Sequence, residues 1–108
     1  MSQMSSRQPC VYILASQKRG TTYIGVTSNL AARIYQHRMR ATPGFTSRHG
    51  VIRLVHAEAF DRMADAIARE KQLKNWHRQW KINLIEAGNP EWTDLGIVWG
   101  LVERKPRL

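Results

Sequence analysis

Cysteine is nearly absent from this chain, since Cys10 is the only one among 108 residues. A single thiol excludes an internal disulfide and a zinc centre built from several cysteines. Cys10 lies in a short apolar segment, where a free cysteine behaves as a small core residue. The chemistry of the protein therefore has to come from other side chains.

Long apolar runs are also missing. No stretch approaches the roughly 20 apolar residues that a membrane-spanning helix needs. Residues 1–9 are polar and lack the apolar core of a signal peptide. We therefore expect a cytoplasmic protein, and the length suits one domain with one modest core.

Acidic residues are scarce. Asp and Glu number 8 against 17 Lys and Arg, which gives a net charge of +9. This excess favours a polyanionic partner, most simply nucleic acid bound through its phosphates. The alternative is a basic surface that only aids solubility, and an anionic membrane fits less well because no long basic amphipathic helix is evident. We expect a monomer that binds nucleic acid, with no membrane and no protein partner.

Two strand-like runs, residues 10–15 and 21–26, predict a β-hairpin joined by a polar loop that ends in Gly20. If the first strand ends opposite Gly20, Tyr12 lies opposite Tyr23. Directly opposed side chains share one face, with Cβ atoms about 4.5–5.5 Å apart. Two phenols would then stand side by side, and an aromatic pair that only packs is the alternative.

A helix is predicted over residues 30–41, because Thr27-Ser28-Asn29 favours a helix N-cap. Arg33 and His37 are four residues apart and therefore lie on one face of this helix. They flank its apolar stripe, so we expect a guanidinium and an imidazole near the sheet. The alternative is two solvated polar residues.

Gly25, inside the second strand, marks a bulge, a bend or the close approach of another backbone.

Residues 51–60 predict a third strand, whose nearly continuous apolar start suggests that both of its faces are covered. His56 and Glu58 share one face of it. A second helix is expected over residues 62–76, with Asp61 as its N-cap.

Glu70 is the most informative anomaly of the sequence. At about 100° per residue, it falls near the middle of the apolar stripe that includes Ala66 and Leu73. A lone carboxylate that faces a core is costly unless it is paired or binds a cation. The position of Glu70 around the helix axis favours a metal ligand over an ion pair with a neighbouring Lys or Arg on a solvated face.

Basic and aromatic residues interleave in the next segment. Such residues can grip a backbone and stack bases, but tryptophans at helical spacing are more often core residues, and we favour a core role. The last helix is expected to end at residues 88–90, and residues 96–108 predict a basic tail. The interleaved residues are Lys71, Lys74, Trp76, His77, Arg78, Trp80 and Lys81.

One ordered set of residues consists of Val11-Tyr12-Ile13, then Tyr23-Ile24-Gly25, then Arg33. This set resembles the GIY-YIG nuclease family. The first triplet departs from the family name, because Val11 replaces the glycine and Tyr12 precedes the isoleucine. The resemblance spans residues 10–95 and is closest to small single-domain bacterial members. It implies an α/β domain with a three-stranded antiparallel or mixed sheet flanked by helices, between flexible residues 1–9 and the tail.

The resemblance implies a metal-dependent endonuclease. Glu70 would hold one Mg²⁺ or Mn²⁺ ion, which suits a hard carboxylate, and Arg33 would stabilise negative charge on the phosphate. By chemistry alone, Tyr12, Tyr23 or His37 can serve as the base. The resemblance favours Tyr12 with support from Tyr23, and leaves His37 as a supporting base or phosphate ligand.

Substrate contacts are predicted for Gly25, Thr27, Arg48 and Lys74. We expect DNA in preference to RNA, selected by structure and not by a long sequence, because the chain has no room for a second recognition domain. Val26 stands where repair nucleases of the family often carry lysine. The alternative is therefore a nucleic-acid-binding module of the same fold with weak or no catalysis.

Overall fold

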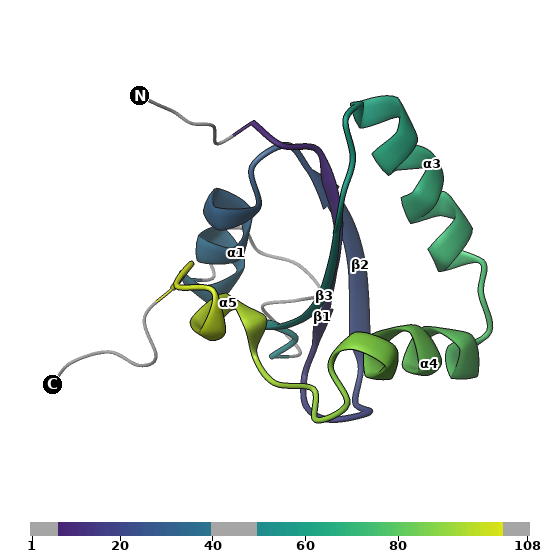
Figure 1. The fold of residues 1–108 in the computed structure, drawn as a ribbon. Coiled ribbons are helices and arrows are strands. Elements are labelled where there is room, and N and C mark those ends of the chain that lie inside the picture. Colours follow the sequence, from purple (N-terminus) through teal and green to yellow (C-terminus); the bar gives the residue numbers. More distant parts are fainter. Residues whose placement is uncertain (1–6, 40–49, 103–108) are drawn as a thin grey trace, which may run out of the picture.

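The computed structural model describes residues 7–39 and 50–102. Its centre is a three-stranded sheet with the order β2-β1-β3. β1 (Cys10–Ala15) pairs antiparallel with β2 (Thr22–Thr27) and with β3 (Arg53–Ala59). Figure 1 shows helices on both sides of this sheet. The expected fold class is confirmed, in its antiparallel form.

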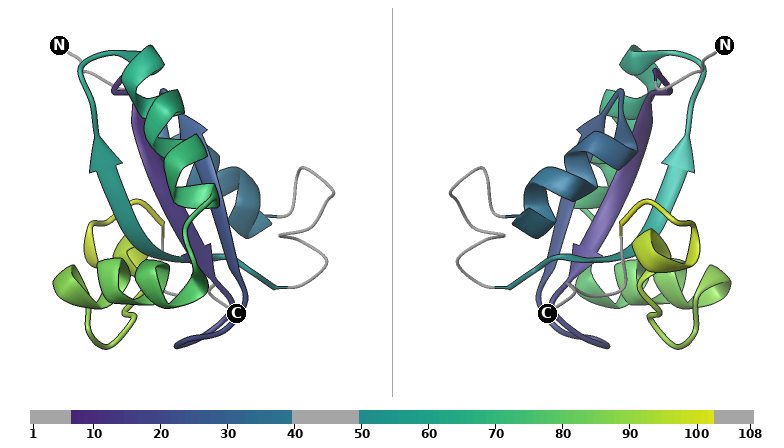
Figure 2. Two further views of the ribbon diagram at one scale, coloured as in Figure 1. Left: turned by 90° about the vertical axis from the view of Figure 1, so that its right-hand side faces the viewer. Right: turned by 90° about the vertical axis from the view of Figure 1, so that its left-hand side faces the viewer.

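The helices form two layers, which Figures 1 and 2 show from three sides. One layer consists of α1 (Leu30–Met39) and the short α5 (Leu95–Val98). The other consists of α3 (Met63–Lys74) and α4 (Arg78–Gly88). Each layer packs on its own face of the sheet, so the described residues form two buried clusters instead of one.

β1 contributes to both clusters, because successive side chains of a strand point to opposite faces. Val11 and Ile13 belong to the cluster under α3 and α4. Tyr12 and Leu14 belong to the cluster under α1 and α5. All six residues of β1 are buried. Five of the six side chains of β1 therefore belong to one of the two buried clusters.

The register of the hairpin differs from the prediction. β1 ends opposite Thr22 instead of Gly20, so Tyr12 pairs with Gly25 and is diagonal to Tyr23. A shift of one residue would exchange the faces of a strand, whereas a shift of two preserves them. The two phenols therefore still share one face, although they are not directly opposed.

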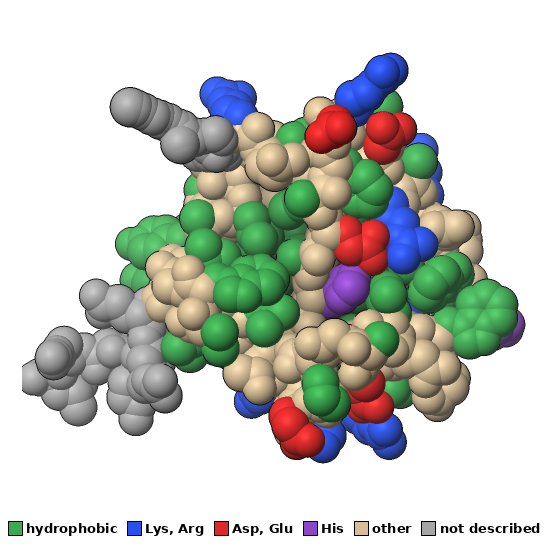
Figure 3. Space-filling view, viewed as in Figure 1, with side chains coloured by type: hydrophobic (Ala, Val, Ile, Leu, Met, Phe, Trp, Pro, Cys, Tyr) green, Lys and Arg blue, Asp and Glu red, His purple; other side chains and the backbone are tan. Residues whose placement is uncertain are grey.

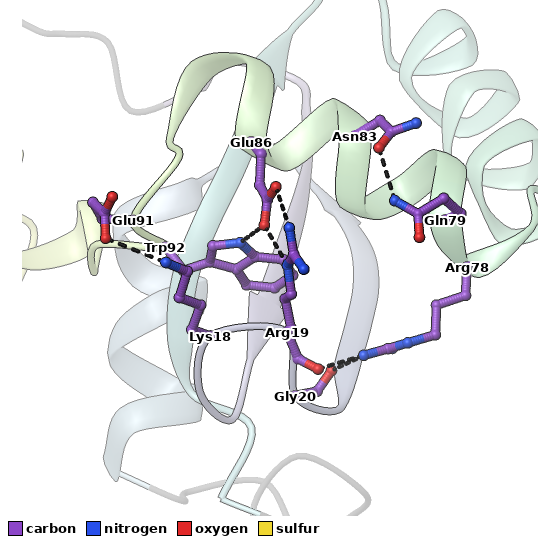
Figure 4. A network of polar contacts seen from close by, with 9 residues as sticks. All are labelled: Lys18, Arg19, Gly20, Arg78, Gln79, Asn83, Glu86, Glu91 and Trp92. Atoms are coloured by element: carbon purple, nitrogen blue, oxygen red, sulfur yellow. Dashed lines mark hydrogen bonds and ion pairs between the residues drawn. The ribbon is translucent and has the colours of Figure 1, made fainter.

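Contacts of the β1–β2 loop fix this register. The N–H of Ser16 donates to the carbonyl of Thr21 at 2.9 Å and closes the loop. Arg19, with a positive φ of 57°, donates two hydrogen bonds to Glu86 on α4 at 2.8 and 2.9 Å. Glu86 also accepts from Nε1 of Trp92 at 2.7 Å, as Figure 4 shows. The longer loop is thus fastened to α4, and the sequence pattern of the two strands carries no information on that contact.

β3 is an edge strand that is nevertheless covered on both faces, as predicted. Leu54 belongs to one buried cluster and Val55 to the other. The strand begins at Arg53, later than the apolar run suggested. His56 and Glu58 share a face, and their side chains meet at 2.8 Å.

The start of α1 was predicted correctly, whereas the predicted cap of α3 is wrong. Oδ1 of Asn29 accepts a hydrogen bond from the N–H of Ala32 at 3.1 Å. In α3 the N-cap is Arg62 and not Asp61, and Arg62 makes no side-chain cap bond. A cap residue contributes only about 1 kcal/mol, so packing of α3 on the sheet decides where this helix begins.

Both ends of the described chain belong to the folded unit. The N–H of Gln8 donates to the carbonyl of Ser28 at 2.8 Å, inside the segment expected to be flexible. Leu101 and Val102 pack against the cluster under α1 and α5, beyond the boundary expected at residue 95. Within the described ranges, no helix has the length and apolarity needed to cross a membrane.

Candidate functional site

Tyr12 on β1 is fully buried, and its ring lies against Gly25 on the neighbouring strand. A Cβ atom at Gly25 would lie 2.5 Å from both Cζ and Oη of Tyr12. The close approach that the glycine permits is therefore that of an aromatic ring and not of a second backbone. Gly25 thereby determines where the phenol of Tyr12 can lie.

His37 on α1 meets this phenol. Its Nε2 lies 3.0 Å from Oη of Tyr12, and the two ring centroids are 5.8 Å apart. Tyr23 completes the group, with its ring centroid 5.6 Å from that of His37 and 6.4 Å from that of Tyr12. Three rings from β1, β2 and α1 thus gather on one face of the sheet.

Arg33 supplies the positive charge of this group. It lies four residues before His37 on α1, and it acts on the phenol of Tyr12 by lowering the pKa of that group. Arg33 and His37 therefore lie next to each other on the sheet-facing side of the helix, as predicted.

Burial controls the protonation states of the group. It raises the pKa of Tyr12 to about 12, and Tyr23 adds to this rise, while Arg33 opposes it. Burial also lowers the pKa of His37 below its usual 6.5, and the charge of Arg33 lowers it further. At neutral pH Tyr12 is protonated and His37 is neutral. In the tautomer that carries its hydrogen on Nδ1, Nε2 of His37 can therefore accept the proton of Oη of Tyr12.

Glu70 lies in the other helical layer. It belongs to α3, on the sheet-facing side between Ala66 and Leu73, and its side chain is only 16% exposed. Its Oε2 lies 3.1 Å from Nζ of Lys74. The expected position in the apolar stripe is borne out, but α3 packs on the face of the sheet opposite to Tyr12. The structure thus gathers Tyr12 with its three neighbours and places Glu70 apart from them.

The donor chemistry at Glu70 suits a hard divalent cation, although it offers few ligands. The described residues hold no group of three or more His, Cys, Asp or Glu side chains able to surround a metal. Mg²⁺ keeps several waters and often takes only one or two carboxylates plus phosphate oxygens. A mostly buried carboxylate whose partner is the ammonium of Lys74 can therefore exchange that cation for a metal ion.

The remaining predicted substrate contacts have other partners or lie elsewhere. Oγ1 of Thr27 accepts from the N–H of Asn29 at 3.0 Å, which supports the start of α1. Nζ of Lys74 forms an ion pair with Oε2 of Glu70. Arg48 lies outside the described residues.

One positioning residue was missed by sequence reasoning. Asp94, at the N-cap of α5, accepts from the guanidinium of Arg38 at 2.6 Å, next to His37 in the chain. The same carboxylate accepts from the N–H groups of Gly96 at 3.0 Å and Leu54 at 3.3 Å. It therefore ties α1 to β3 and α5. An Asp two residues before a Gly is a turn signal, but it does not indicate a partner on a distant helix.

Two asparagines, Asn83 on α4 and Asn89 at its C-cap, have different environments. Asn89 is buried, and it bonds the carbonyl of Val55 at 3.2 Å and both backbone groups of Thr93. It holds the turn after α4 against β3. Asn83 is exposed on α4 and accepts from the side chain of Gln79 at 2.9 Å.

A model of the GIY-YIG catalytic domain matches residues 8–83. This chain belongs to the GIY-YIG family. The matched range includes Tyr12, Tyr23, Arg33 and His37, which together we call the phenol–imidazole group, and it also includes Glu70. Proteins with a GIY-YIG domain are typically endonucleases that use a divalent metal and bind nucleic acid. The resemblance drawn from the tyrosine, arginine and glycine positions is therefore confirmed.

Three relatives support this membership, and each carries the name UPF0213, which states no activity. The UPF0213 protein SSP2268 of Staphylococcus saprophyticus is 32% identical over 72% of this chain and 94% of its own length. The UPF0213 protein CPE1444 of Clostridium perfringens is 35% identical over 71% of this chain and 82% of its own. The solution structure of the UPF0213 protein BH0048 from Bacillus halodurans is 27% identical, with a TM-score of 0.52, over 84% of this chain and 96% of that one. This chain covers most of the length of each of these relatives.

Proposed function

We propose that the protein is a metal-dependent endonuclease that hydrolyses phosphodiester bonds in nucleic acid, preferably DNA selected by its structure. The observation that carries this proposal is the 3.0 Å contact between Oη of Tyr12 and Nε2 of His37, with Arg33 acting on the same phenol. Membership of the GIY-YIG family supports it.

In the proposed reaction a water oxygen attacks phosphorus, and the bond from phosphorus to the leaving sugar oxygen breaks. The proton of the water passes to Oη of Tyr12, while the proton of Tyr12 passes to Nε2 of neutral His37. This relay avoids a free phenolate, which a pKa of about 12 makes rare at neutral pH. Arg33, whose planar guanidinium matches phosphate oxygens, stabilises the developing negative charge. The leaving oxygen takes a proton from solvent.

Glu70 would hold the divalent ion, Mg²⁺ or Mn²⁺, which when bound polarises the phosphate and stabilises the leaving oxygen. β2 is an edge strand, and α3 packs on β2 and β1 from the side opposite to α1. A substrate that uses both Glu70 and Tyr12 would therefore pass around the β2 edge, where Tyr23 lies. Thr27, Lys74 and Arg48 stay predictions as substrate contacts.

The test is cleavage of labelled single-stranded, nicked, flapped and branched DNA, and of RNA, with Mg²⁺ or Mn²⁺. We expect Arg33→Ala, His37→Ala and Glu70→Ala each to reduce cleavage by about a hundredfold or more. Glu91→Ala is the matched control for Glu70, because Glu91 is a carboxylate that is 77% exposed. Equal residual cleavage in wild type, Arg33→Ala and Glu70→Ala would contradict the proposal.

A second candidate is a binding module that has kept the fold without useful catalysis. Two observations favour it: Val26 stands where repair nucleases of the family often carry lysine, and Glu70 is paired with Lys74 in the other layer. It predicts salt-sensitive binding of nucleic acid with no cleavage under any metal condition. Metal-dependent cleavage that is lost in Glu70→Ala would exclude it.

A further inference from the structure

A shallow groove lies where α3 meets α4, in the helical layer that holds Glu70. Its lining consists of Trp76, Trp80, Asn83 and Leu84, and its volume is about 350 Å³. This volume is at the lower end of the range for sites that hold small organic groups. Figure 3 shows a prominent group of apolar side chains at this corner of the molecule.

Core packing accounts for Trp92 but not for Trp80. Trp92 is fully buried, whereas Trp80 is 53% exposed. The ring of Trp80 meets those of Trp76 and His77 at 85° and 89°, with centroids 5.8 and 5.4 Å apart. Rings at near right angles do not stack in parallel, so neither neighbour covers Trp80 as a base would. Trp76 has a cation over its ring already, because Arg69 lies 5.1 Å from its centroid.

The surroundings of the groove are strongly basic. Residues 69–81 contain five Lys or Arg residues and one acidic residue, Glu70. Lys71 and Lys81 make no ion pair with any other described residue. A polyanion is the partner that such a segment attracts. The side-chain amides of Gln79 and Asn83, joined at 2.9 Å, add donors and acceptors at the rim.

We propose that this groove binds an unpaired nucleotide of single-stranded nucleic acid, with its base stacked on Trp80 and its phosphates near Lys71 and Lys81. The inference rests on the proposed function only in taking nucleic acid as the partner. A base inside a duplex cannot reach the ring, so the groove favours substrates with an unpaired segment beside the cleavage point. It thereby names the structural preference of the enzyme as flaps, overhangs or single strands.

The experiment measures binding of a short fluorescein-labelled oligothymidylate and of a blunt duplex, by anisotropy, with EDTA present to prevent cleavage. We expect Trp80→Ala to weaken oligothymidylate binding by about tenfold, and Trp80→Phe, which keeps a ring, by about threefold or less. Trp99→Ala is the matched control, since Trp99 is 50% exposed but lies at the end of α5 in the other layer. Duplex binding should be the same in all four proteins.

A second measurement keeps the proposal falsifiable if Trp80→Ala folds poorly. Oligothymidylate should quench the tryptophan fluorescence of the wild type more than that of Trp80→Phe. Equal single-strand binding in wild type and a folded Trp80→Ala, or equal losses for single strand and duplex, would overturn the inference. So would a dimer in sedimentation that Trp80→Ala dissociates, because the groove would then hold a second copy of the chain. Absence of cleavage would refute the nuclease proposal and leave these binding results unaffected.

Discussion

Gly25 is the residue on which the geometry of the phenol–imidazole group depends most directly. In Gly25→Ala the new Cβ would lie 2.5 Å from Oη of Tyr12, whose ring is fully buried. The ring must shift, which we expect to lower the free energy of unfolding by about 1–3 kcal/mol and cleavage by about tenfold or more. Urea denaturation and cleavage rates measure the two effects. Gly88→Ala is the control, because no heavy atom lies within 4 Å of its added Cβ, and an equal response of both variants would contradict the prediction.

The shifted pKa of His37 gives a prediction for pH dependence. Its folded pKa lies below the usual 6.5, so the stability linked to it is present above that value and is lost as pH falls through the folded pKa. Only neutral His37 can accept the proton of Tyr12, so cleavage should rise with pH to a plateau with an apparent pKa below 6.5. Tyr12, with a pKa raised from 10 to about 12, keeps its proton over the whole plateau.

The measurement is the pH profile of kcat/KM for wild type and His37→Gln. The variant should lose the acidic limb along with most of its activity. A wild-type profile that keeps rising through pH 10, the ordinary pKa of tyrosine, would assign the base to the phenol alone and contradict the relay.

The sequence allowed the phenol–imidazole group to be predicted, because each of its parts depends on local periodicity. Tyr12 and Tyr23 keep a common face despite the wrong register, since the error was two residues. Arg33 and His37 share a helix face by their spacing. The layer of Glu70 could not be predicted in this way. An apolar stripe shows that a helix packs on the sheet, but β1 is apolar on both faces and does not indicate which face each helix covers.

At the scale of elements, the long segments were predictable and the short one was not. The strands and α1, α3 and α4 follow from apolar patterns and turn residues. α5 has only four residues, Leu95–Val98, too few for a helical period to show. It depends on a tertiary contact, because Asp94 at its N-cap also binds Arg38 of α1.

Asp94→Ala tests this tie between elements. Arg38 and Asp94 are mostly buried, and Nε of Arg38 is buried without a hydrogen-bond partner among the described residues, so the guanidinium depends on this carboxylate. Removing one partner of such a pair typically costs about 3 kcal/mol, and we expect a loss of that order in the free energy of unfolding. Glu91→Ala, which removes the exposed pair with Lys18, should cost about 1 kcal/mol or less. Equal effects in urea denaturation would show that Asp94 does not join the elements.

At the scale of the whole molecule, the charge of +9 determines how the protein meets nucleic acid. Binding by counterion release falls steeply with salt, and each phosphate contact to a single strand adds about 0.7 to the magnitude of the slope of log K against log salt. The uneven distribution of the cations matters more than their number. Lys71 and Lys81 lie around the junction of α3 and α4, whereas Arg62 precedes the opposite end of α3 (Figure 1).

Two double variants, each of which removes two positive charges, therefore locate the surface that contacts nucleic acid. Lys71→Gln with Lys81→Gln should lower the magnitude of the salt slope by about 1.4, because two phosphate contacts to the single strand are lost. Arg7→Gln with Arg62→Gln removes the same charge from exposed positions away from the groove, and should change the slope by less than half as much. Titrations of single-stranded DNA at several salt concentrations give both slopes. If the two pairs changed the slope equally, net charge alone would govern binding, and the α3–α4 junction would have no special part in it.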